Sequence, residues 1–155
     1  MRIRTQRKNR RTAASLVEFA FVAPLLFLLL IGVLEYARFL FTLQLVNNAA
    51  REGARFAAVN TTTETTASVQ TYVNNYLAGQ GAAQYVGYSP SSNITVYMAD
   101  PVTGQNTGLS WLNATWGNCV GVSITGTYQP ILPGLLSITG SLTLTGTCVV
   151  SIEAN

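Results

Sequence analysis

The sequence of 155 residues contains no histidine and a single lysine, Lys8. After Arg55 its only charged side chains are Glu64, Asp100 and Glu153. Acid–base catalysis and zinc binding need such groups held close together, so this composition argues against an enzyme and against a zinc site with the usual ligands. No glycine-rich phosphate loop accompanies a strand-to-helix pattern. We therefore expect no catalytic residue, no cofactor, no metal and no small-molecule substrate.

The cations of the chain are gathered at its N-terminus. All nine Lys and Arg residues occur at or before Arg55, and six of them fall within the first eleven positions with no acid among them. A basic run of this kind is typical of a nucleic-acid-binding arm or a solvated tail. Here a charge-free apolar stretch, FAFVAPLLFLLLIGVL, begins at Phe19 and ends at Leu34. We therefore expect membrane lipid, and no nucleic acid, as the partner.

The apolar stretch is long enough to cross a bilayer. It continues to Val46 with only Glu35 and Arg38 as interruptions, and about 20 apolar residues suffice for a hydrocarbon core of about 30 Å. It is too long for a removable secretory signal and leads into a helix-favouring segment, so we predict a retained anchor with its transmembrane part at about 19–41. The basic flank places the N-terminus in the cytoplasm and the C-terminal domain outside it.

We predict an α+β chain in three parts. Residues 1–13 form a basic cytoplasmic segment, 14–59 form a long helix with the transmembrane part, and 60–155 form a small extracytoplasmic domain. Thr61 and Glu64 have capping-box spacing, which predicts the start of one short helix. Alternating apolar residues predict an antiparallel β-sheet after it. The apolar positions of this helix and of three strands are Val69, Tyr72, Val73, Tyr76 and Leu77; Ile94, Val96 and Met98; Val120, Val122 and Ile124; and Leu142, Leu144, Cys148, Val150 and Ile152.

Small residues recur at steps of four along the upper part of the long helix. Rows of this kind let another backbone approach closely. They are equally consistent with packing of the helix on the chain's own domain, and the sequence leaves both interpretations open. The two rows are Ala49, Gly53 and Ala57, and Ala50, Ala54 and Ala58.

Two cysteines, Cys119 and Cys148, lie in the part predicted to be outside the cytoplasm. In an oxidising compartment the expectation is a disulfide between them. Their strand positions oppose this, because Cys148 shares the parity of the apolar residues of its strand whereas Cys119 does not share that of Val120 and Val122. A bulge, or a position of Cys119 just before its strand, would resolve the conflict.

Four residues of the anchor are costly in lipid. Glu35 and Arg38 are three apart, so on a helix they can pair with each other as an intramembrane pair. Glu18 has no cation three or four residues away, and its candidate partners are the basic tail, lipid headgroups or another molecule. Pro24 removes one backbone hydrogen bond and should loosen the helix locally.

The stretches AASLVEFAFVAPLLFLLLIGVLEYARF and NAAREGARFAA together resemble TadE-like proteins, the pseudopilins (minor pilins) of Tad/Flp type IVb pilus systems. The resemblance covers roughly residues 13–58. It implies a prepilin held in the bacterial inner (cytoplasmic) membrane and cut by a prepilin peptidase between Ala13 and Ala14, where Ala13 replaces the usual Gly. Glu18 would then be the fifth mature residue, with Phe19 as its aromatic neighbour and Pro24 within the assembly helix.

The same resemblance implies the partners of the chain. They would be the major pilin, other minor pilins, the inner-membrane assembly platform and the prepilin peptidase, with incorporation into pili as the end point. The alternative is a stand-alone membrane-anchored binding module, such as an adhesin that presents the Thr- and Asn-rich domain. Five aromatic residues could serve a binding surface, although such residues usually occupy core or strand-face positions. They are Tyr85, Tyr88, Trp111, Trp116 and Tyr128.

Overall fold

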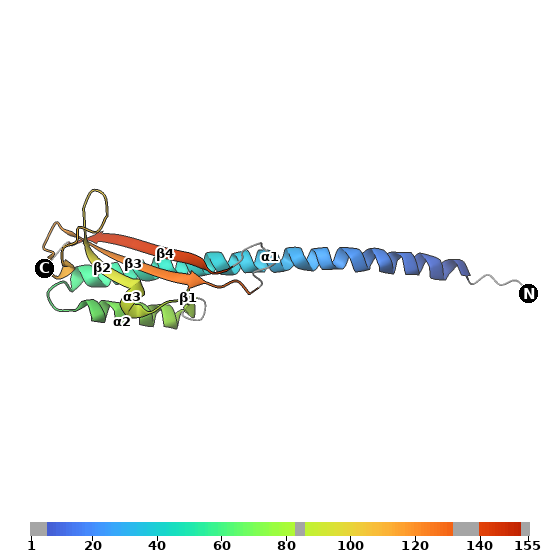
Figure 1. Cartoon of the computed structure of the whole chain (residues 1–155), viewed down its shortest axis with the longest axis horizontal. Coiled ribbons are helices and arrows are strands. Elements are labelled where there is room, and N and C mark those ends of the chain that lie inside the picture. Colours follow the sequence, from blue (N-terminus) through green and yellow to red (C-terminus); the bar gives the residue numbers. More distant parts are fainter. Residues whose placement is uncertain (1–5, 83–85, 132–139, 153–155) are drawn as a thin grey trace, which may run out of the picture.

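The computed structural model describes residues 6–82, 86–131 and 140–152. A long N-terminal helix is followed by a small domain with a short helix and an antiparallel sheet, so the predicted α+β fold is confirmed. The two ends of the chain lie at opposite ends of the molecule (Figure 1).

Helix α1 comprises Gln6–Val59, 54 residues, with Pro24 inside it. At about 1.5 Å of rise per residue it is about 80 Å long. Figure 1 shows that the domain covers only the C-terminal part of α1, while the N-terminal part projects as a bare rod. The division of the helix into a bare and a covered part determines where every candidate site lies.

Helix α2, Thr66–Gly79, runs alongside the covered part of α1 (Figure 1). Its N-cap is Thr65, whose side chain accepts a hydrogen bond from the backbone N–H of Ser68 at 3.2 Å. The predicted start at Thr61 is therefore wrong. The N–H of Glu64 bonds to the carbonyl of Asn60 at 3.1 Å, which holds the intervening residues in a turn. The predicted apolar face is correct at Val69, Val73 and Leu77, which are fully buried.

The sheet is built around β3, Cys119–Tyr128. Strand β4, Leu142–Ser151, pairs with β3 along one edge over ten residues. Strands β2, Ile94–Ala99, and β1, Val86–Gly87, share the other edge, and all pairings are antiparallel. The three predicted strands are confirmed, whereas the two-residue β1 was not expected. The short helices α3, Pro90–Asn93, and η2, Trp111–Asn113, lie before and after β2.

One face of the sheet packs on α1. Val96, Val122 and Cys148 face one another across three strands, which places their side chains on the same side of the sheet. Thr127 and Thr143, in contrast, belong to the opposite, polar face. The buried core joins α1, α2 and the inner sheet face, as the alternation predicted. Its fully buried members include Val46, Ala50, Ala54, Val69, Val73, Leu77, Ile94, Val120, Val122 and Ile124.

The predicted Cys119–Cys148 disulfide is wrong: both cysteines are free. Cys148 pairs with Val122 on the inner face, whereas Cys119 pairs with Ser151 on the outer face. The ten β3–β4 pairs run in regular register with no bulge that could bring the sulfurs to one side. Strand alternation therefore overrides the expectation from the oxidising compartment, because turning either thiol over would expose an entire apolar face.

The free state of the cysteines can be measured directly. Denaturation and alkylation of the purified chain without reductant should add two adducts, one on each thiol. In the folded chain Cys148 should react slowly, because burial raises the pKa of its thiol and less of the reactive thiolate is present. Intact-mass spectrometry reads both results. A chain that takes up adducts only after reduction would contradict the observed register.

The small-residue rows of α1 pack against the chain's own domain. Ala49, Gly53 and Ala57 are buried, as are Ala50, Ala54 and Ala58. A Cβ atom at Gly53 would collide with Cγ2 of Val73 and lie 3.4 Å from Val122. The two interpretations left open by the sequence are thus decided in favour of the intramolecular one.

Candidate functional site: the bare helix and its junction with the domain

The bare part of α1 is apolar on all sides. From Leu16 to Leu34 every large apolar side chain is exposed, for example Phe21 at 74% and Phe27 at 61%. This stretch rises about 27 Å at about 1.5 Å per residue, close to the thickness of a hydrocarbon core. Within the described residues α1 is the one helix long and apolar enough to cross a membrane. The chain therefore fits a single-pass membrane protein.

The predicted processing and assembly residues all lie on this bare helix. Ala13, Ala14 and Glu18 are exposed, and Phe19 is 68% exposed. Within the described part of the chain, the Glu18 carboxylate forms no hydrogen bond or ion pair with another group. The structure does not bring these residues into contact with the domain, so they remain available to another molecule.

Pro24 lies in the middle of the bare segment, and α1 runs through it without interruption. Because proline has no backbone N–H, the carbonyl of Ala20 receives no helical hydrogen bond at this turn. The effect on the helix is local, and no part of the domain lies nearby to compensate for it (Figure 1).

Glu35 and Arg38 lie where the domain first meets α1. Nη2 of Arg38 is 3.7 Å from Oε1 of Glu35. The hydroxyl group of Tyr128, at the end of β3, donates a hydrogen bond to the same oxygen at 2.5 Å. Nε of Arg38 in turn donates to the Tyr128 hydroxyl oxygen at 3.0 Å. We call these three residues the junction cluster.

The junction cluster also holds the backbone that follows β3. Nη2 of Arg38 donates to the carbonyl of Gln129 at 2.7 Å. The N–H of Ile131 donates to Oε1 of Glu35 at 3.3 Å. The ring of Tyr128 packs edge-on against Phe39 with centroids 5.5 Å apart. About one turn of α1, from Glu35 to Phe39, thus fixes the end of the sheet nearest the bare helix.

Burial makes this cluster energetically demanding. Glu35 is only 6% exposed and Tyr128 only 1%. A buried carboxylate is tolerated only when cations and donors replace its water, and Arg38, Tyr128 and the Ile131 amide do so here. Burial raises the pKa of the Tyr128 hydroxyl, and its hydrogen bond to Glu35 raises it further. The phenol therefore remains a donor at physiological pH.

The sequence pointed to Glu35 and Arg38 as partners of each other but missed Tyr128. Their shortest contacts are with β3 and the residues after it, not with one another. A signal was present, because Tyr128 shares the parity of Val120, Val122 and Ile124 and therefore belongs to the face that packs on α1. Trp111, another of the five aromatics, is buried and donates to Thr66.

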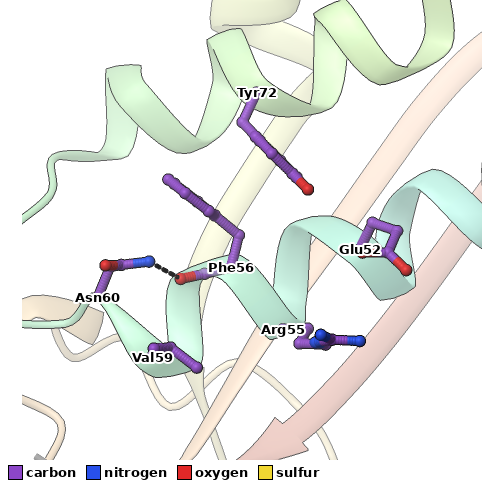
Figure 2. A pocket seen from close by; sticks show the side chains of 6 residues that line it. All are labelled: Glu52, Arg55, Phe56, Val59, Asn60 and Tyr72. Carbon is purple, nitrogen blue, oxygen red and sulfur yellow. Dashed lines mark hydrogen bonds between the residues drawn. The ribbon is translucent and has the colours of Figure 1, made fainter.

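A shallow hollow of about 210 Å³ lies between the end of α1 and α2. Figure 2 shows the rings of Phe56 and Tyr72 side by side between the two helices, with Glu52 and Arg55 farther along α1. The two rings stack with centroids 4.4 Å apart, and the side-chain amide of Asn60 donates to the Phe56 carbonyl at 2.8 Å. These contacts hold the two helices together. In the described residues no three His, Cys, Asp or Glu side chains could share a metal ion.

Comparison with known proteins gives one match. Residues 13–55 match the family model described as TadE-like protein. No curated protein sequence and no solved structure matches the chain. The matched segment contains the bare helix, the α1 half of the junction cluster and the small-residue rows as far as Arg55, and over it the resemblance seen in the sequence is confirmed.

Proposed function

From the TadE-like character of residues 13–55 we propose that the chain is a minor pilin (pseudopilin) of a Tad/Flp type IVb pilus or a related secretion filament. It is a structural protein with no catalytic role. It is inserted in the bacterial inner membrane by α1, with the N-terminus in the cytoplasm and the domain outside. Its partners are the major pilin, other minor pilins, the assembly platform and a prepilin peptidase.

The observation that carries this proposal is the bare apolar rod with a single carboxylate near its beginning. All large side chains from Leu16 to Leu34 are exposed, and such a surface needs either lipid or other apolar helices around it. A filament core of packed helices would replace lipid as the environment of this rod. The domain covers none of it, so the same helix can serve as a membrane anchor and then as an assembly segment.

Glu18 has a defined task in this proposal. Cleavage between Ala13 and Ala14 leaves Glu18 as the fifth residue and frees an ammonium group at Ala14. In an apolar bundle the ammonium of one subunit can neutralise the carboxylate of a neighbour, and the low dielectric strengthens their attraction while desolvation offsets part of it. The absence of a partner for Glu18 within the described residues supports an intermolecular one.

N-terminal sequencing of the chain from membrane and filament fractions tests the processing step. A mature start at Ala14 is expected in filaments, where the chain should occur at a low ratio to the major subunit. An intact basic segment 1–13 in both fractions would contradict the mechanism. Retention only in the membrane, with normal piliation after deletion, would favour a stand-alone binding module instead.

Replacement of Glu18 with alanine should leave membrane insertion intact and lower the amount of the chain in sheared filaments, because the inter-subunit charge pair is lost. The matched control is Glu64→Ala, which removes an acid from the domain without touching the bare helix. Quantitative immunoblots of membrane and filament fractions give both readings. Equal incorporation of the two variants would mean that Glu18 has no role in assembly and is only a carboxylate at the level of the lipid headgroups.

A further inference from the structure

We propose that the membrane-proximal end of the domain itself contacts the bilayer, through a collar of exposed apolar side chains next to the junction cluster. The collar consists of Tyr36, Leu40 and Phe41 on α1 and Ile131 after β3. Its partner is the interfacial layer of a lipid membrane. The inference rests on the part of the proposed function that places α1 in a membrane.

The collar is exposed although its side chains are large and apolar. Tyr36 is 61% exposed, Leu40 38%, Phe41 51% and Ile131 67%. Ile131 is held at the level of Glu35 by the hydrogen bond from its N–H to Oε1. The collar thus lies next to the junction cluster along the chain and directly continues the bare helix, whose last exposed residue before it is Leu34.

The charges at this level are withdrawn from the outer surface. Glu35 is 6% exposed, and the Arg38 side chain, at 21%, is engaged by the Tyr128 hydroxyl and the Gln129 carbonyl. Apart from the hydroxyl group of Tyr36, the first exposed polar side chain of α1 above Leu34 is that of Gln44. The presence of a glutamate and an arginine in the sequence therefore does not mark the end of the apolar exterior, because both face the domain.

The length of this exterior indicates where it lies. From Leu16 to Phe41 α1 rises about 38 Å at about 1.5 Å per residue. This exceeds a hydrocarbon core of about 30 Å but fits within the 40–45 Å that includes the headgroup regions. When the bare helix fills the core, the collar falls at the interface, where tyrosine and other amphipathic rings are favoured. We choose lipid as the partner of the collar because the collar is continuous with the apolar surface of the bare helix that spans the membrane.

The test places a tryptophan at each depth and measures quenching by brominated phosphatidylcholine. The full chain is reconstituted at one copy per nanodisc, so that no second copy can cover the collar. Ile131→Trp reports the collar and Phe27→Trp reports the middle of the span. Val102→Trp is the matched control, because Val102 is 90% exposed and follows β2 at the opposite end of the domain. Emission from the native Trp111 and Trp116 is subtracted with the parent chain.

We expect bromines near the glycerol end of the acyl chain to quench Ile131→Trp several-fold more than Val102→Trp, and aqueous iodide to show the reverse order. Phe27→Trp should be quenched best by bromines deep in the chain. If Phe27→Trp is quenched while Ile131→Trp behaves like Val102→Trp, the collar proposal is overturned and the anchor stands. If Phe27→Trp is also unquenched, the membrane placement fails together with the collar. Thermal unfolding matching the parent chain verifies that each variant is folded.

Discussion

Replacement of Tyr128 with alanine should lower the free energy of unfolding of the domain by about 3–5 kcal/mol, as for other large buried aromatics. Two losses combine in this variant. A side chain that is 1% exposed leaves a cavity beside Phe39, and the buried Glu35 carboxylate loses its 2.5 Å donor. The domain should also detach from α1 at its membrane-proximal end, because the end of the sheet is fixed there through the junction cluster.

Tyr128→Phe separates the hydroxyl group from the ring. It keeps the packing but leaves Glu35 and Nε of Arg38 each short of one partner, so about 1–3 kcal/mol should be lost. Tyr97→Phe is the control, since Tyr97 lies half-buried on the outer face of the sheet, over Gly121, and no buried charge depends on its hydroxyl group. Its loss should therefore cost less than that of the Tyr128 hydroxyl group. Denaturant unfolding of the full chain in micelles, followed by near-UV circular dichroism, measures both variants.

A double variant shows whether the hydroxyl acts through Glu35. When both partners become apolar, no buried carboxylate remains to be satisfied. Glu35→Leu combined with Tyr128→Phe should therefore cost less than the sum of the two single changes. Strict additivity would mean that the Tyr128 hydroxyl group contributes to stability independently of Glu35, for example through Nε of Arg38. If Tyr128→Phe lowers the free energy of unfolding no more than Tyr97→Phe does, the hydrogen bond between Tyr128 and Glu35 does not stabilise the domain.

Most of the fold could be predicted because periodicity within single segments determines it. The apolar run gave the position of α1, the spacing of Val69, Val73 and Leu77 gave the inner face of α2, and alternation gave the three long strands with their correct faces. Two-residue strand β1 has no periodicity to detect. The start of α2 was misplaced because both Thr61 and Thr65 are suitable N-cap residues. In the structure Thr65 is the N-cap, whereas Thr61 is buried, and this difference depends on tertiary packing.

The parts that could not be predicted depend on pairing between distant segments. Arg38 and Tyr128 are 90 positions apart, and no local pattern states that β3 ends beside Glu35. The small residues around Gly53 suit any close neighbour, so their partner was ambiguous until α2 and β3 were in place. For the disulfide, in contrast, local sequence was sufficient, because the strand parity of Cys119 and Cys148 already argued against a bond between them.

Replacement of Gly53 with alanine should destabilise the domain by about 1–3 kcal/mol, the usual cost of overfilling a packed core. The added methyl group would collide with Cγ2 of Val73 on α2 and touch Val122 on β3. Helix propensity opposes this loss, because alanine is favoured over glycine by about 1 kcal/mol in a helix interior. A net loss therefore requires that the packing cost exceed this gain, which makes the sign of the change informative.

Gly32→Ala on the same helix is the matched control. No atom lies within 4 Å of a Cβ at Gly32, so thermal unfolding of this variant should be unchanged or slightly raised. Because Val73→Ala removes the colliding methyl group, Val73→Ala introduced with Gly53→Ala should cost less than the sum of the two single changes, although Val73 is itself fully buried. This coupling can occur only if Gly53 packs on its own domain. If Gly53→Ala leaves stability unchanged but lowers filament incorporation, the small-residue row serves a neighbouring subunit, and the close approach of α1 and α2 at this point would be contradicted.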